Sequence, residues 1–311
     1  NNKEMNKTIR HIVAFSGGKD SSALGIYLKN PEKWRHLLGK TGLVFREPLV
    51  NPEYVFCDTG TELAETYDYL KKLEAELGAT VTRLQADDFS DSRLDIKTPF
   101  DHYLHQYGGM LPSAQVRWCT RMLKLKPYEW FLGDDQAISY VGIRADEDRL
   151  GYLSTKPNIT TVFPFKEDGI DKDDVYRILE ESGVGVPAYY NWRSRSGCYF
   201  CFFQRKSEWV GLLEHHPKLF QKALEYEKLE SKNESGFTWS ERESLEELAK
   251  PERIAQIKED QKKRQERLLK KHRPKKLIQM DDLIGEADRW KSLDALRDME
   301  DDSVGCNMCH L

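Results

Sequence analysis

The stretch of this chain best suited to chemistry is rich in glycine and hydroxyl groups. It consists of Ser16, Gly17, Gly18, Lys19, Asp20 and Ser21. Two glycines allow a tight turn that brings backbone N–H groups against a phosphate, and the N-terminus of a following helix adds partial positive charge. Lys19 supplies a full positive charge, and the serines supply hydroxyl donors. The stretch indicates a phosphate-binding loop, with an ordinary glycine-rich turn as the alternative.

A second group of candidate residues follows later apolar runs. Asp58, Thr59 and Gly60 come directly after the run that ends at Cys57, and Arg144 comes after another. A carboxylate at the end of a strand can hold Mg²⁺ on a pyrophosphate or contact the nucleotide, because hard dications prefer oxygen ligands. A planar guanidinium matches the oxygens of a phosphate. We therefore expect Asp58 and Arg144 to face the nucleotide, and a helix-capping role is the alternative for Asp58.

Four of the six cysteines form two C-x-x-C pairs, Cys198 with Cys201 and Cys306 with Cys309. Six cysteines in 311 residues are too few for a secreted disulfide scaffold, so reduced thiolates on a metal are favoured over disulfides. The first pair is compatible with zinc, a redox dithiol or an iron–sulfur cluster. Cys57 lies within an apolar run and is interpreted as a buried packing residue.

Alternating strand and helix patterns position these groups. The first strand pattern begins at His11, and later ones cover Tyr54–Cys57, Val81–Leu84, Gln136–Ile143 and Thr160–Phe165. Helical patterns follow the strand at His11 and the strand at Tyr54–Cys57, and another begins at Asp171. Strands that alternate with helices predict an α/β fold with a mainly parallel sheet, helices on both faces, and ligands beyond the carboxyl ends of the strands.

The strand patterns stop near Lys206, and the chain becomes charged and helical. We therefore predict two domains, residues 1–205 with the phosphate loop and the cysteines, and residues 206–311 as a helical C-terminal region. Hydrophobic residues make up 39% of the chain and charged residues 32%, which is compatible with a folded core beneath a highly charged surface. No run approaches the roughly 18 apolar residues of a membrane-spanning helix. The composition predicts a cytoplasmic protein without a membrane partner.

The charge along the C-terminal region is strongly divided, although the whole chain has a formal net charge of −4. Residues 261–276 contain nine basic residues and one acid, and residues 281–302 contain nine acids and three basic residues. A basic run of this density suits a phosphate backbone, bound largely without reading bases. We expect a nucleic-acid partner, and a solvated helix or pairing with the acidic stretch is the alternative.

The glycine-rich loop resembles the signature of the PP-loop ATP pyrophosphatase superfamily, and it lacks the spacing of a P-loop or a dinucleotide-binding loop. Three further segments resemble the phosphoadenosine phosphosulfate reductase-like branch of that superfamily: residues 57–66, residues 118–127 and residues 142–149. The resemblance covers residues 11 to about 205. It implies an adenine nucleotide alpha hydrolase-like fold that binds ATP and Mg²⁺. It also implies catalysis in which Lys19 and an Asp58-bound Mg²⁺ neutralise charge as pyrophosphate leaves.

The same resemblance implies a role for Cys119, which in iron–sulfur members of this branch converges with the later C-x-x-C pair on a [4Fe–4S] cluster. Trp118 stands where four-cysteine members have another Cys. Cys119, Cys198 and Cys201 would then leave one iron free to bind a hydrosulfide. Zinc at these three cysteines is the alternative. Cys306 or Cys309 would supply a fourth ligand, form a separate site, or have no role.

The basic tail and the reductase-like motifs resemble the enzymes of bacterial DNA phosphorothioation. That resemblance implies adenylation of a DNA backbone phosphate and its replacement by sulfur, with a sulfur donor such as a cysteine desulfurase and other modification-system proteins as partners. The alternatives are a tRNA thiolation enzyme, a sulfonucleotide reductase that cleaves no ATP, and a nucleotide-regulated binding module.

Overall fold

A computed structural model describes residues 9–38, 46–86, 98–148, 154, 156–195, 197–231, 238–240 and 243–271. These residues form two compact units. Unit 1 contains the described residues up to 191 together with 195 and 197–201, and unit 2 contains 192–194 and those from 202 onward. The predicted domain boundary after residue 205 stays a prediction. Arg149, Cys306, Cys309 and the whole acidic stretch lie outside the described residues.

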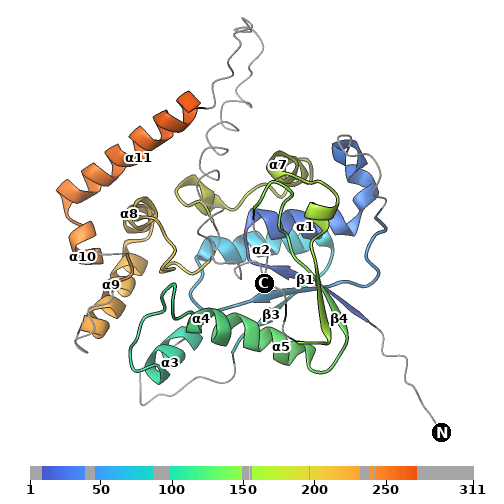
Figure 1. Cartoon of the computed structure of the whole chain (residues 1–311), viewed down its shortest axis with the longest axis horizontal. Coiled ribbons are helices and arrows are strands. Elements are labelled where there is room, and N and C mark those ends of the chain that lie inside the picture. The colour runs from blue at the N-terminus through green and yellow to red at the C-terminus, as the bar shows by residue number, and fades with distance from the viewer. Residues whose placement is uncertain are drawn as a thin grey trace, which may run out of the picture. The chain divides into compact units, whose positions relative to one another are not determined.

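Unit 1 is built on five parallel strands in the order β3-β2-β1-β4-β5 (Figure 1). The strands are β1 Arg10–Phe15, β2 Glu53–Cys57, β3 Val81–Leu84, β4 Ala137–Tyr140 and β5 Ile159–Val162. In the central pairings Val13 lies opposite Tyr54 on β2 and Tyr140 on β4. The predicted parallel α/β fold is confirmed. Because β1 is central, the loop after it lies at the middle of the carboxyl edge of the sheet.

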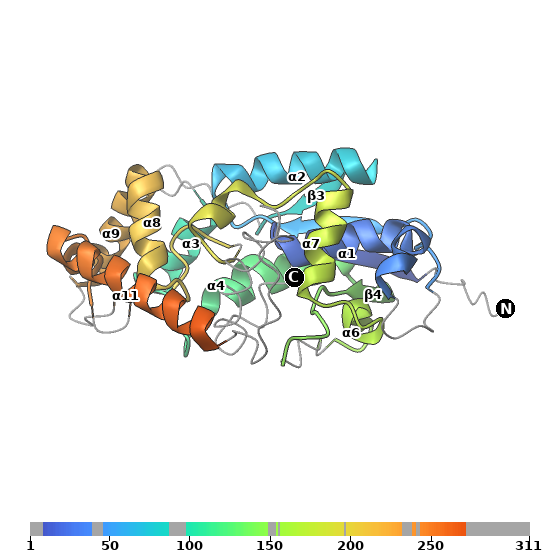
Figure 2. The same ribbon diagram turned by 90° about the horizontal axis from the view of Figure 1, so that it is seen from above.

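Side chains of β1 alternate between two cores, as expected for a strand that is covered on both faces. Val13 and Phe15 belong to the core beneath α1 Lys19–Lys29, α2 Ala64–Leu77 and α7 Lys172–Glu181. Ile12 and Ala14 belong to the opposite core, which includes side chains of α5 Lys126–Leu132. Figure 2 shows α1, α2 and α7 side by side from above. The alternating burial therefore places β1 between two layers of helices.

Shorter elements connect these layers and complete unit 1. They are η1 Pro31–Leu38, α3 Pro99–Gln106, α4 Trp118–Thr120, the π-helical turn η2 Arg121–Leu125, α6 Pro164–Glu167 and η3 Ala188–Asn191.

The predicted helix start at Asp171 is confirmed by a capping box, in which Asp171 and Asp174 accept each other's backbone N–H. The strand expected over Gln136–Ile143 is shorter, because the chain leaves the sheet after Tyr140 and Gly142 lies against the backbone of Asp20.

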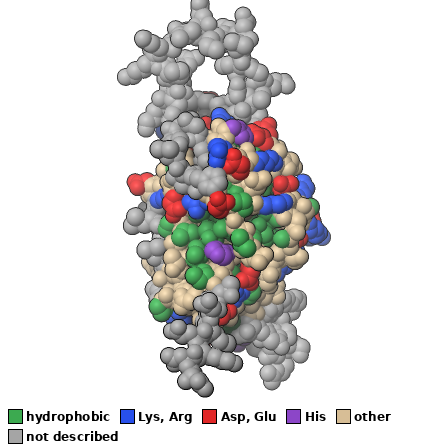
Figure 3. Space-filling view, turned by 90° about the vertical axis from the view of Figure 1, so that its right-hand side faces the viewer, with side chains coloured by type: hydrophobic (Ala, Val, Ile, Leu, Met, Phe, Trp, Pro, Cys, Tyr) green, Lys and Arg blue, Asp and Glu red, His purple; other side chains and the backbone are tan. Residues whose placement is uncertain are grey.

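The side of the molecule nearest β4 is shown in Figure 3. Hydrophobic side chains gather near the centre of this face, and most of the charged side chains lie above them. No helix among the described residues has the length and apolar character needed to cross a membrane.

Unit 2 contains four helices, α8 Lys206–His215, α9 Pro217–Ser231, α10 Leu245–Leu248 and α11 Pro251–Lys271. Trp209 on α8 packs against Phe220 on α9 and against Trp239, with ring centroids 6.4 and 6.2 Å away. Glu227 accepts backbone hydrogen bonds from Trp239 and Leu245, at 2.9 and 2.7 Å. An aromatic core and one buried carboxylate therefore hold the chain after α9 in place. The helical character predicted for this part of the chain is confirmed.

A single carboxylate ties the ends of this helical unit together. Glu243 forms ion pairs with Lys206 at the start of α8 and with Arg253 in the first turn of α11. The hydrogen bond from Arg253, supported by the one from Lys206, lowers the pKa of Glu243 to about 2. The ionised form of Glu243 therefore stabilises the folded unit.

We expect Glu243→Gln to lower the free energy of unfolding at pH 7 by about 1 kcal/mol, the upper range for an ion pair near the surface. The folded-state pKa lies below the unfolded value, so this contribution is complete above about pH 4.5 and is lost as the pH falls toward 2. Urea unfolding should show the difference from wild type shrinking between about pH 5 and pH 3. Glu246→Gln, at a side chain 68% exposed, is the control. Equal losses of unfolding free energy in the two variants, or a loss that does not depend on pH, would contradict the stabilising role of the Glu243 ion pairs.

Candidate functional site

The glycine-rich loop joins the central strand to α1, and its backbone leaves no room for side chains. Gly17 has φ +76°, and a Cβ there would lie 2.5 Å from the methyl group of Thr66. Gly18 is the N-cap of α1 and has no side chain to cap the first turn. The Ser21 hydroxyl accepts a hydrogen bond from the Ser16 amide at 3.1 Å, which closes the loop. A compact turn therefore presents the N-terminus of α1, whose N-cap residue has no side chain, at the carboxyl edge of the sheet.

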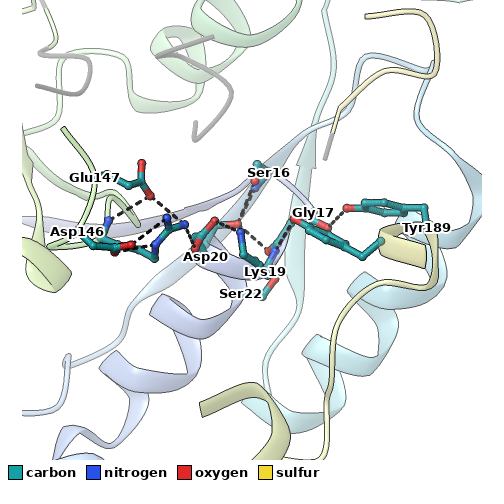
Figure 4. Close-up of polar contacts among 12 residues, drawn as sticks. Ser16, Gly17, Lys19, Asp20, Ser22, Asp146, Glu147 and Tyr189 are labelled. Atoms are coloured by element: carbon teal, nitrogen blue, oxygen red, sulfur yellow. Dashed lines mark hydrogen bonds and ion pairs between the residues drawn. The ribbon is translucent and has the colours of Figure 1, made fainter. Parts of the chain in front are cut away.

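Two cations meet one buried carboxylate beside this loop (Figure 4). Asp20 accepts from Lys19 Nζ at 3.1 Å and from Arg144 Nη1 at 3.0 Å. Arg144 also pairs with Asp146 at 3.0 Å and with Glu147 at 3.2 Å. Burial lowers the pKa of Arg144, but the charges of Asp20 and Glu147 outweigh burial and raise it. The structure thus brings Lys19, Asp20 and Arg144 together, and Arg144 is engaged by carboxylates where we expected phosphate contact.

The loop after β4 touches the phosphate loop through its backbone as well. A Cβ on Gly142 would lie 2.9 Å from the carbonyl oxygen of Asp20 and 3.2 Å from Cα of Ser21. Both neighbours are backbone atoms, so any side chain at position 142 would displace the first turn of α1. The position of α1 therefore depends on Gly142.

Two tyrosines from η3 also contact the loop, and the sequence analysis did not identify either. Tyr189 is buried and donates to the carbonyl of Gly17 at 2.7 Å. The Tyr190 hydroxyl accepts from the backbone N–H of Lys19 at 3.3 Å, and its ring lies 5.7 Å from Lys19 Nζ. Figure 4 shows Tyr189 on one side of the loop and Asp146 and Glu147 on the other. The loop is thus held from two directions.

Asp58 lies at the end of β2, as predicted, within a network of hydrogen bonds. One carboxylate oxygen accepts from the Gly60 amide at 2.9 Å and from Tyr67 Oη at 2.8 Å, and the other accepts from Gln85 at 3.2 Å. An ionised carboxylate has about four acceptor sites, and the neighbouring Glu62 carboxyl also interacts with Asp58, so a metal ion would take the place of one of these partners. Mg²⁺ held through a single Asp58 oxygen, with nucleotide oxygens and waters as the other ligands, would need one such exchange.

Glu62 is a second carboxylate at this edge of the sheet. It accepts from Thr59 Oγ1 at 2.7 Å and from the Thr61 amide at 3.1 Å. Burial and the nearby charge of Asp58 raise the pKa of Glu62 to about 7. Thr59 is almost fully buried, and Gly60, with φ +73°, lies close to the ring of Pro99. Thr59 and Gly60 therefore shape the loop after β2.

Cys198 lies against this same loop. Its Sγ is 3.3 Å from Thr59 Oγ1, and the amide of the next residue, Tyr199, donates to the carbonyl of Thr61 at 3.0 Å. Burial, followed by the charge of Glu62, raises the pKa of Cys198 to about 11. Cys57 is buried as predicted, and burial raises its pKa to about 12. In the structure as described, both thiols are therefore protonated near neutral pH.

Aromatic rings link the segments that carry the other two candidate cysteines. Phe100 packs on Trp118, which precedes Cys119, and on Phe200, which precedes Cys201, with centroids 5.0 and 4.2 Å apart. Within the described ranges, however, no group of three or more His, Cys, Asp or Glu side chains is placed to hold a metal ion. The side chains as placed do not fit a [4Fe–4S] cluster or a zinc ion at Cys119, Cys198 and Cys201, so both stay predictions from sequence.

Comparisons with known proteins relate most of this chain to a known domain. The sequence profile of the phosphoadenosine phosphosulfate reductase domain matches residues 10–201. The chain is 28% identical over 225 residues to an uncharacterized protein of Methanocaldococcus jannaschii, and the match covers 68% of this chain and 40% of that protein. It is 24% identical over 224 residues to an uncharacterized nin region protein of Escherichia phage lambda, and this match covers 65% of this chain and 68% of that protein. The chain therefore spans less than half of the archaeal relative.

The structure is similar to a crystal structure of phosphoadenylyl-sulfate reductase from Candida auris in complex with phosphate. The TM-score is 0.41 at 14% identity, and the match covers 63% of this chain and 84% of that chain.

We expect Gly142→Ala to weaken binding of an ATP analogue by about tenfold or more, because small displacements of a ligand site have large effects. Isothermal titration calorimetry would measure the affinity. Gly211→Ala is the matched control, since its Cβ would lie 2.6 Å from the Trp192 ring within unit 2. Gly211→Ala should lower the melting temperature and leave the affinity unchanged. An unaltered affinity in Gly142→Ala would contradict this prediction and show that the glycine-rich loop accommodates the added methyl group.

Proposed function

The chain belongs to the phosphoadenosine phosphosulfate reductase domain family, and from this premise we propose that it is an ATP pyrophosphatase that activates a nucleic-acid phosphate for thiolation. The observation that carries the proposal is the loop beside β1. The N-terminus of α1, the Lys19 ammonium and the Arg144 guanidinium lie together at the carboxyl edge of a parallel sheet. Anionic ligands bind at such edges and helix ends.

The proposed chemistry begins with adenylation. A non-bridging oxygen of the acceptor attacks the α-phosphorus of ATP, an O–P bond forms, and the bond to the β-phosphate oxygen breaks. Pyrophosphate leaves with the electron pair. In this proposal Lys19 stabilises negative charge on the phosphates, and an Asp58-held Mg²⁺ would supply a Lewis acid for the leaving group.

The second step transfers sulfur to the activated acceptor. A thiol first releases hydrosulfide from the persulfide of a donor protein, such as a cysteine desulfurase, and a disulfide is left on the donor. The hydrosulfide attacks the activated phosphorus, a P–S bond forms with loss of the S–H proton, and AMP leaves with its oxygen. Cys198 is the thiol at this edge of the sheet, through its contact with Thr59. We assign no step to a metal cluster, because the described cysteines are not arranged to hold one.

The basic surface of α11 supports a nucleic-acid acceptor. Lys262, Lys263, Arg264 and Arg267 are all exposed on this helix, and Glu266 is the only acid from Gln261 to its end. Lysine and arginine on one helix bind a phosphate backbone by releasing its counterions. We propose DNA as the partner, with other modification-system proteins, and a tRNA is the other nucleic acid to test.

A sulfonucleotide reductase is the second candidate function, and the matched family profile favours it. Such an enzyme reduces an already activated sulfate and releases no pyrophosphate from ATP. A binding module that uses nucleotide only to control assembly would also release none. Pyrophosphate release therefore separates the proposed function from both.

Purified protein supplied with ATP, Mg²⁺ and DNA should release pyrophosphate. Lys19→Gln should lower that rate by about 100-fold or more, the usual cost of removing one group that stabilises transition-state charge. Lys29→Gln, at the other end of α1 where Lys29 is exposed, is the control and should leave the rate unchanged. A coupled pyrophosphate assay measures both. Reduction of a sulfonucleotide without pyrophosphate release would establish the second candidate.

We expect Lys263→Glu with Arg267→Glu to weaken binding of duplex DNA at least tenfold at about 100 mM salt, because fewer phosphate contacts remain. Fluorescence anisotropy over a salt series would measure the affinity, and the salt dependence should become shallower. Lys71→Glu with Lys72→Glu, two exposed positions on α2, gives the same change in net charge and should have little effect. Equal losses for both pairs would show that only net charge matters. A preference for tRNA over DNA in wild type would favour the tRNA alternative.

A further inference from the structure

Tyr190 contacts the two groups of Lys19 that would face a bound phosphate. Its hydroxyl oxygen accepts the backbone N–H of Lys19 at 3.3 Å. Its ring lies 5.7 Å from the Lys19 ammonium, within the range of a cation–π interaction. Lys19 is the first residue of α1, and its N–H is one of the orphan donors that a phosphate at a helix N-terminus accepts.

We propose that Tyr190 is a latch on the nucleotide loop, in which a phenol oxygen takes the place of a phosphate oxygen until nucleotide binds. This inference rests on the proposed nucleotide site. A phosphate oxygen and a phenol oxygen both accept the Lys19 N–H, so they cannot occupy that donor together. The charged acceptor makes the stronger hydrogen bond, so nucleotide displaces the Tyr190 hydroxyl.

The neighbouring Tyr189 has the opposite role. Its hydroxyl donates to the carbonyl of Gly17 at 2.7 Å, and a carbonyl oxygen repels phosphate. Tyr189 is 1% exposed, whereas Tyr190 is partly exposed and better able to move. The segment before them is held separately, because Tyr69 on α2 donates to the carbonyl of Gly185 at 2.9 Å. Tyr189 therefore supports the loop in the shape that binds, and Tyr190 competes with the ligand.

The latch is consistent with the burial of Lys19. Only 3% of this lysine is exposed, and its ammonium is paired with Asp20. The Tyr190 ring adds a second favourable contact for that charge, and the phenol oxygen accepts the adjacent backbone N–H. The polar groups of Lys19 therefore have hydrogen-bond and cation–π partners before nucleotide binds. Part of the binding free energy of the nucleotide is used to displace the Tyr190 hydroxyl.

The test compares two adjacent Tyr→Phe variants, each of which removes one hydroxyl. Binding of α,β-methylene-ATP with Mg²⁺ would be measured by calorimetry, because this analogue cannot release pyrophosphate. Tyr190→Phe should bind about three- to fivefold more tightly than wild type, the effect of removing one weak competing hydrogen bond. Tyr189→Phe should bind about tenfold more weakly, because the Gly17 carbonyl loses its donor. Thermal melts check that both variants fold.

Tighter binding by Tyr190→Phe together with weaker binding by Tyr189→Phe supports the latch. If wild type binds the analogue and Tyr190→Phe binds equally or more weakly, Tyr190 is a structural support and the latch is wrong. If wild type does not bind the analogue at all, the proposed nucleotide site is wrong, and the latch is wrong with it. Hydrogen exchange of residues 188–191 is a second measurement, and it should become faster when the analogue binds wild type.

Discussion

The carboxylate of Asp20 is the point on which the arrangement of the site depends. It belongs to the first turn of α1, is 7% exposed, and joins Lys19 to Arg144 across 124 residues of sequence. A buried carboxylate left without a cation costs about 3–5 kcal/mol, so both contacts favour keeping Lys19 and Arg144 beside Asp20. The loops after β1 and β4 must therefore keep one fixed separation. The close approach of Gly142 to the Asp20 carbonyl is a consequence of the same constraint.

This network also determines which ligand the loop can accept. Lys19 and Arg144 carry two formal positive charges, and Asp20, Asp146 and Glu147 carry three negative ones. The five groups together are formally −1, so a bare triphosphate is repelled overall even though individual donors face it. Asp58 adds one more negative charge, and in the proposed complex a dication between Asp58 and the phosphates would bring the sum to zero. The electrostatics therefore favour a magnesium–nucleotide complex over the free nucleotide.

The features that the sequence predicted correctly depend on local patterns. The continuous apolar run of Ile12, Val13, Ala14 and Phe15 is typical of a strand buried on both faces, and Asp171 marks a capped helix start. The partners of Arg144 were not predicted, because a guanidinium can bind either phosphate or carboxylate and only the fold decides between them. Asp146 and Glu147 are nearby in sequence, but Asp20 is brought to Arg144 by the pairing of β1 with β4. Tyr189 and Tyr190 were missed for the same reason, since more than 170 residues separate them from the loop.

The segment that carries Cys198 is held in position by contacts with other protein groups. The amide of Tyr199 donates to the Thr61 carbonyl, and the Cys198 thiol lies beside the Thr59 hydroxyl. Phe200 packs on Phe100, so apolar contact holds the other side of the segment. Two of these contacts, the Tyr199 amide to the Thr61 carbonyl and Phe200 on Phe100, do not involve the thiol. The loop after β2 therefore fixes Cys198 at the same edge of the sheet as the nucleotide loop, where a protonated thiol needs only to lose its proton to become a sulfur nucleophile.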